Sequence, residues 1–227
     1  MPHSRDVIIE AGGARLHGRL DVPEGCTGLV VFSHGSGSSR FSPRNQAVAA
    51  FLNRGALGTL LLDLLTADES VTDGLTGEYR FDIDLLTRRL TGAVDWLSSQ
   101  PELAALPVGL FGSSTGAASA LNTAASRPEI VGAVVSRGGR ADLAMPSLPL
   151  VRAPTLLIVG ERDETVITMN REAAIRLRAE HALAIVPGAT HLFEEPGTLE
   201  EVARLARDWF GRHLVRTPAR GVAAGGR

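Results

Sequence analysis

The chain has 227 residues, of which 44% are hydrophobic and 21% charged. This length and balance predict either one sizeable α/β domain with its own core or two small ones. A formal net charge of −2 gives no electrostatic basis for a nucleic-acid partner or a membrane surface. The single cysteine, Cys26, excludes an internal disulfide and cannot form a cysteine-based metal site by itself.

The two ends of the sequence carry no sign of a targeting or membrane segment. The first 13 residues, MPHSRDVIIEAGG, lack a basic region followed by a long apolar stretch, and no apolar run reaches membrane-spanning length. We therefore expect a cytoplasmic protein, as a monomer or homodimer. Residues 216–227 are small, Gly-rich and basic, which predicts a disordered tail after a single domain at 1–215.

Strand patterns recur along the chain. Alternating apolar and polar residues on either side of Gly12-Gly13 predict an antiparallel hairpin over 7–23. Continuous apolar runs, typical of strands buried on both faces, follow at 28–34, 57–65, 107–112, 130–136, 154–160 and 182–188.

Helical patterns lie between these strands, with apolar residues at three- and four-residue spacing. They cover 44–55, 81–99, 115–128, 168–180 and 199–214. Alternation of strand and helix predicts a mostly parallel sheet with helices on both faces, led by an antiparallel pair. In such sheets the reactive groups lie in loops at the carboxyl ends of the strands.

One of these loops carries a candidate nucleophile. The stretch Gly112-Ser113-Ser114-Thr115-Gly116 fits the pattern G-x-S-x-G only when it is centred on Ser114, and it lies between a buried strand and a helix of small residues. This context is typical of a nucleophile elbow, where glycines permit a strained turn at a helix N-terminus. The alternative is a plain capping turn, and Ser113 is expected to be structural.

A serine nucleophile needs a base and an orienting acid. Asp163 follows the strand at 154–160, and His191 lies in the loop after the strand at 182–188. Glu161 and Glu164 are the neighbouring rivals for the acid. Asp163 could instead cap the next helix, and His191 could be a surface histidine. The chain order of serine, aspartate and histidine nevertheless matches the order expected of an α/β-hydrolase.

The Gly-rich segment FSHGSGSSR at 32–40 directly follows a strand. Such a turn can direct a backbone N–H toward the carbonyl oxygen of a bound ester, and we assign this donor to Ser36. The N–H of Thr115 would supply the second donor of an oxyanion hole. A flexible Gly/Ser loop is the alternative, and His34 is expected to be structural.

Together, SHGSGSS, GSSTG, GERDE and GATHLF occur in an order that resembles the α/β-hydrolase superfamily, within it the dienelactone-hydrolase-like branch without a cap domain. The resemblance covers residues 6 to 215. It implies an eight-stranded, mainly parallel sheet and a serine-hydrolase mechanism that uses no cofactor or metal. Dienelactone hydrolases proper use a cysteine as the nucleophile, whereas this chain has Ser114, which favours carboxylesterase activity over dienelactone turnover.

The segments between strands limit the substrate. Residues 137–153 are too few for an inserted cap domain, and the loop at 66–80 is the other stretch able to overhang the site. An open pocket favours a small-molecule ester with a small or short acyl group. Lactone or dienelactone hydrolysis, acyl transfer and perhydrolysis by the same triad remain open, as does a ligand-binding protein that has the fold without catalysis.

A last motif, SRGGR at 136–140, follows another buried strand. Arg137 could therefore lie in the cleft and bind a substrate carboxylate or phosphate, with Arg40 and Arg44 contributing. The alternative is that Arg137 forms a structural ion pair with Asp63 or Asp142.

Overall fold

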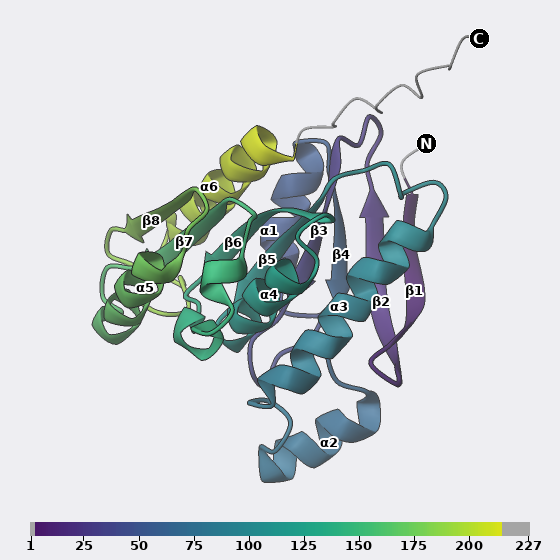
Figure 1. The fold of residues 1–227 in the computed structure, drawn as a ribbon, viewed down its shortest axis with the longest axis horizontal. Helices are drawn as coiled ribbons and strands as arrows, with labels where there is room; N and C mark the ends of the chain where they lie inside the picture. Colours follow the sequence, from purple (N-terminus) through teal and green to yellow (C-terminus); the bar gives the residue numbers. More distant parts are fainter. Residues whose placement is uncertain (1–2, 215–227) are drawn as a thin grey trace, which may run out of the picture.

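The computed structural model describes residues 3–214, so the tail predicted at 216–227 lies outside the described residues. Within them, one sheet has the strand order β1-β2-β4-β3-β5-β6-β7-β8 (Figure 1). The strands are β1 His3–Ala11, β2 Ala14–Val22, β3 Gly28–Ser33, β4 Leu57–Leu62, β5 Val108–Ser113, β6 Val131–Arg137, β7 Thr155–Gly160 and β8 His181–Val186.

The sheet is antiparallel at one end and parallel through the rest. β1 pairs with β2 and β2 with β4 in antiparallel register, while β4, β3, β5, β6, β7 and β8 are parallel neighbours. Each predicted apolar run overlaps one of these strands. The run at 182–188 was expected to be buried on both faces, but β8 lies at the edge of the sheet and most of its residues are exposed or half-buried. Because the parallel strands share a direction, the loops that follow β3, β5, β6, β7 and β8 all lie at one edge of the sheet.

Helices cover both faces of the sheet (Figure 1). Their bounds are α1 Pro43–Arg54, α2 Ala67–Thr76, α3 Ile83–Ser99, α4 Thr115–Ser126, α5 Glu164–Arg176 and α6 Thr198–His213. Apolar residues of α1 and α6 share one buried cluster with one face of the sheet, and those of α3, α4 and α5 share another with the opposite face. None of the helices within residues 3–214 combines the length and the apolar character needed to cross a bilayer.

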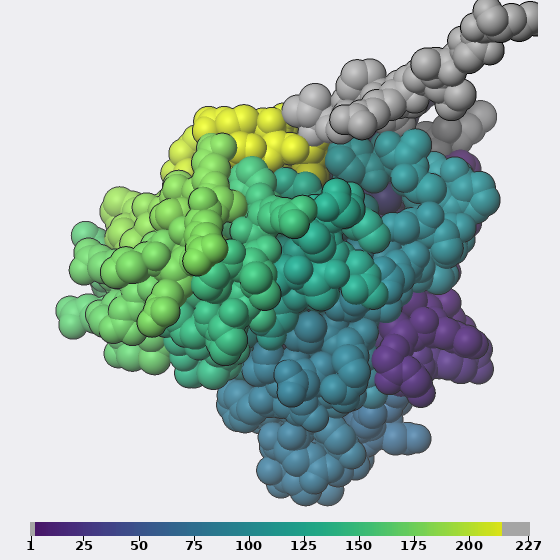
Figure 2. Space-filling model, in the orientation of Figure 1, coloured from purple at the N-terminus to yellow at the C-terminus, as the bar shows by residue number. Residues whose placement is uncertain are grey.

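The segment predicted as a loop at 66–80 contains the helix α2. Thr66 and Glu69 form a capping box, and Gly77 ends the helix in the left-handed conformation at φ 72°. The signal was present in the sequence as Thr-x-x-Glu, but its polar composition suggested a loop. α2 projects from the body of the protein at the lower end of the views in Figures 1 and 2.

The connection between β6 and β7 contains only the short 3-10 helices Ala141–Ala144 and Leu148–Leu150. There is accordingly no large cap domain over the sheet edge, as the sequence predicts. α5 begins at Glu164, four residues earlier than the apolar periodicity indicates, so Asp163 stands directly before its first turn.

Candidate active site

Ser114 lies between β5 and α4 with φ 51° and ψ −122°. A non-glycine residue at positive φ costs free energy that its surroundings must offset. The N–H of Ser114 donates to the carbonyl of Arg137 at 3.2 Å, and its carbonyl accepts from the N–H of Arg140 at 3.0 Å. The loop after β6 thus holds both polar groups of the strained residue.

The two glycines of the elbow allow close backbone approach. A Cβ at Gly112 would overlap the backbone of Ala117, and one at Gly116 would overlap the carbonyl oxygens of Ser33 and His34. No side chain fits either position, since the overlapping atoms belong to the backbone. The G-x-S-x-G spacing therefore reflects contacts between β5, α4 and the end of β3.

His191 and Asp163 are in direct contact. The Nδ1 atom of His191 lies 2.6 Å from a carboxylate oxygen of Asp163, and the Asp163 side chain makes no helix-capping hydrogen bond. The rival carboxylate of Glu161 accepts instead from the N–H of Gly188 at 2.7 Å. The His191 side chain is 38% exposed and that of Asp163 is 14% exposed, so the imidazole can reach a substrate while its partner is shielded.

The loop after β6 also contacts His191. A Cβ at Gly138 would lie 3.4 Å from the Nδ1 and Cε1 atoms of the imidazole, one residue beyond the carbonyl that accepts from Ser114. Within residues 3–214 the hydroxyl of Ser114 makes no hydrogen bond to His191. Contacts of this kind often tighten only when substrate is bound. Residues 137–140 therefore contact both Ser114 and His191.

The loop between β3 and α1 packs on the nucleophile. A Cβ at Gly35 would lie 3.1 Å from the Cβ of Ser114. Among the described residues, neither the N–H of Ser36 nor that of Thr115 donates a hydrogen bond. Both N–H groups therefore have no partner within residues 3–214 and are available to a ligand.

The imidazole of His34 holds this loop through two hydrogen bonds. Its Nε2 accepts from the N–H of Leu64 at 3.0 Å, and its Nδ1 lies 2.9 Å from the carbonyl of Gly35. These partners require the neutral tautomer with the proton on Nδ1. Burial lowers the pKa of His34 below its ordinary value, against the opposing effects of the Gly35 carbonyl and the Asp63 charge. The structure therefore places His34 as a structural residue, as expected.

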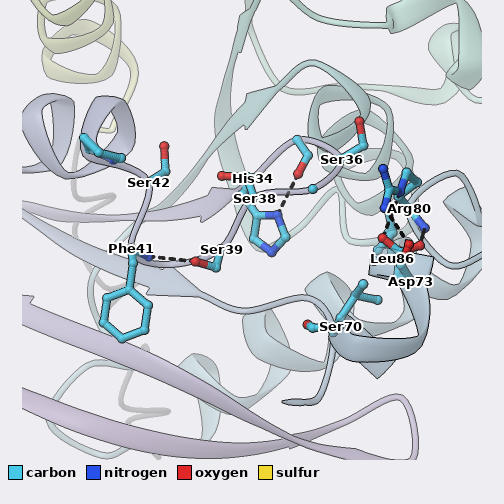
Figure 3. A pocket seen from close by; sticks show the side chains of 15 residues that line it. His34, Ser36, Ser38, Ser39, Phe41, Ser42, Ser70, Asp73, Arg80 and Leu86 are labelled. Carbon is cyan, nitrogen blue, oxygen red and sulfur yellow. Dashed lines mark hydrogen bonds and ion pairs between the residues drawn. The ribbon is translucent and has the colours of Figure 1, made fainter. Parts of the chain in front are cut away.

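An open cleft of about 600 Å³ runs between this loop and α2. Its lining is mixed (Figure 3): it includes the hydroxyl side chains Ser36, Ser38, Ser39, Ser42 and Ser70, together with the apolar side chains Phe41, Leu65 and Leu86. Its far side carries the ion pair between Asp73 and Arg80, at 2.9 Å. Of the two residues with a free N–H, Ser36 lines this cleft.

The arginines of the site differ in their partners. Arg40 forms an ion pair with Asp63, and its N–H donates to the same carboxylate at 2.6 Å. Arg140 pairs with Asp142 at 2.8 Å. The alternative of an ion pair between Arg137 and either carboxylate is therefore wrong, because both acids are occupied by other arginines. The engagement of Arg40 also leaves Arg137 as the candidate for a substrate contact.

Arg137 is 7% exposed. Its Nε and Nη1 atoms are enclosed by protein and have no hydrogen-bond partner. Burial, together with the charge of Arg44, lowers the pKa of Arg137 to about 10. The sequence pattern pointed to this side chain. The sequence pattern did not reveal that backbone groups of residues 137–140 hold Ser114. The paired glycines at 138–139 were the signal that could have indicated it.

Comparison with known proteins identifies the family and the fold. The family model of the Dienelactone hydrolase family matches residues 69–214. A dienelactone hydrolase from Anabaena variabilis is 54% identical, with a TM-score of 0.92 over 94% of this chain and 99% of that one. Est1E from Butyrivibrio proteoclasticus has a TM-score of 0.77 at 16% identity over 91% of this chain and 98% of that one, a likeness of fold alone.

A Mycobacterium tuberculosis protein named "Putative phosphoribosyl transferase" is 54% identical over 209 residues. That match covers 92% of this chain but 46% of the relative, so the chain spans about half the length of that curated relative. More than half of the relative therefore lies outside the matched region. On its fold and the family match, the chain belongs to the dienelactone hydrolase family of α/β-hydrolases.

Proposed function

We propose that the protein is a serine hydrolase that cleaves small or short-chain carboxylic esters through an acyl-enzyme on Ser114. The observation that carries the proposal is the 2.6 Å contact between His191 and Asp163, at the same sheet edge as a strained serine. This contact supports a base that is already oriented by its acid, at the sheet edge where the proposed nucleophile lies.

In the proposed reaction, Nε2 of His191 removes the proton of the Ser114 hydroxyl as Oγ attacks the acyl carbonyl. The free N–H groups of Ser36 and Thr115 hold the oxyanion of the tetrahedral intermediate. His191 then gives its proton to the leaving alkoxide, and an acyl-enzyme remains. Water repeats the sequence and releases the acid, while Asp163 stabilises the imidazolium formed in each half.

The shape of the site supports a small acyl group. Within residues 3–214 no large cap domain covers the sheet edge, and the open cleft of about 600 Å³ combines serine hydroxyls and the Asp73–Arg80 ion pair with only a few apolar side chains. A long fatty acyl chain would leave much of its surface in water there, which removes the main source of its binding free energy.

Lactones are the second candidate substrates. They are favoured by the name of the Anabaena relative, a dienelactone hydrolase that is 54% identical. Ring opening of a cyclic ester uses the same nucleophile, base and oxyanion donors. It differs only in that the leaving alkoxide stays attached to the acyl group.

Turnover of p-nitrophenyl esters of rising chain length, with lactones in the same screen, tests the proposal. Ser114→Ala is expected to lower kcat for p-nitrophenyl acetate by about 10⁴-fold or more and to abolish labelling by a fluorophosphonate probe. Ser113→Ala is the matched control, since the Ser113 hydroxyl donates to Asn45 at 3.2 Å, and it should still be labelled. Wild-type turnover by Ser114→Ala would refute the proposed nucleophile.

A further inference from the structure

The peptide group between Gly139 and Arg140 is hydrogen-bonded to the nucleophile on one side and to α5 on the other. Its N–H, on Arg140, donates to the carbonyl of Ser114 at 3.0 Å. Its carbonyl, on Gly139, accepts from the Nδ2 of Asn170 at 2.8 Å. Because a peptide group is planar, its C=O and N–H cannot turn independently. The hydrogen bond from Asn170 therefore also orients the N–H that holds Ser114.

The carbonyl of Gly139 depends on this side chain. The preceding N–H, on Gly138, is held by the sheet, since it donates to the carbonyl of Ile158 in β7 at 2.8 Å. Among residues 3–214, the Gly139 carbonyl accepts a hydrogen bond from Asn170 and from no other group. The amide of Asn170 is therefore what fixes the direction of this carbonyl.

Gly139 has no space for a side chain that could fix the loop by packing. A Cβ there would lie 1.9 Å from the Oγ of Ser136 and 2.6 Å from the Cβ of Ala117. Both neighbours are fully buried, so neither can move aside at low cost. The position of Gly139 is therefore set by hydrogen bonds to its backbone.

Asn170 is an unfavourable residue for the place that it occupies. The buried residues of α5 are Val166, Asn170 and Ala173, at the spacing of one helix face. Asparagine is a weak helix former, and the Oδ1 of Asn170 is enclosed by protein without a hydrogen-bond partner. An apolar side chain would avoid both costs. The stability of α5 therefore does not explain the amide, whereas the bond to Gly139 does.

The amide group is held in a single orientation. Its Nδ2 also donates to the carbonyl of Val166, one turn earlier in α5, at 2.8 Å. The two hydrogens of the amide nitrogen are thus both used, one within the helix and one across to the loop. A side chain that is 0% exposed and held in this way gives the loop a rigid support.

The same helix is connected to the other two residues of the proposed triad. α5 begins at the residue after Asp163, whose carboxylate contacts His191 at 2.6 Å. Gly138, next to the anchored peptide group, lies against the imidazole, because a Cβ there would be 3.4 Å from its Nδ1. Through α5 and this loop, Asn170 is linked to acid, base and nucleophile.

We propose that Asn170 is a positioning residue, whose amide sets the Gly139–Arg140 peptide group so that Ser114 and His191 are aligned for proton transfer. This inference rests on the proposed function and adds to it a residue that touches neither substrate nor reacting atoms. Without the amide, the peptide group turns, its bond to the Ser114 carbonyl weakens, and the backbone of Ser114 leaves its strained conformation at φ 51°. A displacement of about 1 Å in an active site can cost on the order of 100-fold in rate.

Turnover of p-nitrophenyl acetate by Asn170→Leu tests the proposal, since leucine fills a similar volume and removes the donor. We expect kcat to fall about 10- to 100-fold and KM to change less than about 3-fold, because Asn170 does not line the cleft. Thr123→Val is the matched control. It removes a buried hydroxyl that bonds to Thr91 at 3.1 Å, in the helix that follows the nucleophile, and should keep the wild-type kcat. Each variant is assayed at a temperature where circular dichroism shows it to be fully folded.

Amide hydrogen exchange, followed by NMR, reports on the loop without any turnover. The N–H groups of Arg140 and Ser114 both bond across the contact between loop and nucleophile. They should exchange faster in Asn170→Leu than in the wild type, and at the wild-type rate in Thr123→Val.

A wild-type kcat in Asn170→Leu, where Ser114→Ala has lost turnover, would overturn the positioning role and leave the proposed function standing. A fall in kcat with wild-type exchange at Arg140 and Ser114, or an equal fall in Thr123→Val, would overturn it as well. If Ser114→Ala keeps its turnover, the proposed function fails, and the exchange rates still decide whether Asn170 holds this peptide group. Should Asn170→Leu not fold, Asn170→Ala removes the same donor without a bulky replacement and carries the same comparison.

Discussion

The nucleophile elbow and the segment around α2 lie at the same edge of the sheet, but the chain fixes them by different means. At the elbow, backbone meets backbone: Ser114 is held by main-chain groups of Arg137 and Arg140, and Gly116 lies against the carbonyls of Ser33 and His34. α2 is held by charged side chains. Arg89 donates to both carboxylate oxygens of Glu69 at 2.5 Å.

This difference indicates how each region responds to change. Backbone atoms in close contact cannot move apart to accommodate an added side chain, because protein interiors are closely packed. A side-chain ion pair can be loosened while the fold persists. We therefore expect a substitution at the elbow to act on the fold as a whole and one at the attachment of α2 to act locally.

The largest effect is expected at Gly116, where a side chain would break the rigid part. Gly116→Val places carbon atoms on the carbonyl oxygens of Ser33 and His34, and we expect loss of folded protein or destabilisation by about 3 kcal/mol or more. Urea unfolding followed by circular dichroism measures it. Gly211→Ala is the control, since a Cβ there meets nothing within 4 Å and helix propensity predicts a gain of about 0.5–1 kcal/mol. Normal stability of Gly116→Val would contradict the close approach.

A smaller effect is expected where the side-chain attachment of α2 is removed. Arg89 is 3% exposed and also donates to the carbonyl of Leu64 at 2.7 Å. Arg89→Met leaves Glu69 and Leu64 without that partner, and we expect a loss of about 2–3 kcal/mol. Faster amide exchange at 66–76 and a KM that rises more than kcat falls should accompany it.

The exposed neighbour Arg88 provides the control on the same helix. Arg88→Met should change the free energy of unfolding by less than about 0.5 kcal/mol. It should also leave the rate of amide exchange at 66–76 unchanged. Equal effects of the two substitutions would show that α2 does not depend on the Arg89–Glu69 pair.

The smallest effect concerns His34, which links the two regions. Its pKa in the folded protein lies below the ordinary value of 6.5 because it is buried. Between pH 6.5 and the folded pKa, the imidazole of His34 is protonated in the unfolded chain and neutral in the native state. The free energy of unfolding therefore falls as the pH decreases through this range. The slope from this group is at most about 1.4 kcal/mol per pH unit. Urea unfolding between pH 8 and pH 5 should show a steeper loss for the wild type than for His34→Gln. Parallel curves would contradict this assignment.

The strands and the order of the site residues could be predicted because local patterns determine them. Each buried strand is a continuous apolar run, and the glycines around Ser114 mark a turn that needs them. The helix α2 was not predicted, since its polar sequence resembles a loop and its stability depends on Arg89, 20 residues away from Glu69. Such a contact between distant residues leaves no periodic signal.

The sequence also does not show which carboxylates the arginines pair with. Arg40, Arg137 and Arg140 all follow buried strands or lie near them, and nothing in their spacing shows which reaches Asp63 or Asp142. The choice depends on the face of the sheet to which each side chain points. In the structure Asp63 pairs with Arg40 and Asp142 pairs with Arg140.

The capping of α2 has a consequence for engineering. The segment from Thr66 to Arg80 contains its own start signal in the capping box and its own stop in Gly77, and Asp73 closes it by pairing with Arg80. This segment therefore has its own helix start and stop, and its Glu69 is held by Arg89 of α3. Libraries that vary residues 66–80 but keep Glu69 as the partner of Arg89 would change the wall of the cleft while the backbone contacts around Ser114 stay in place.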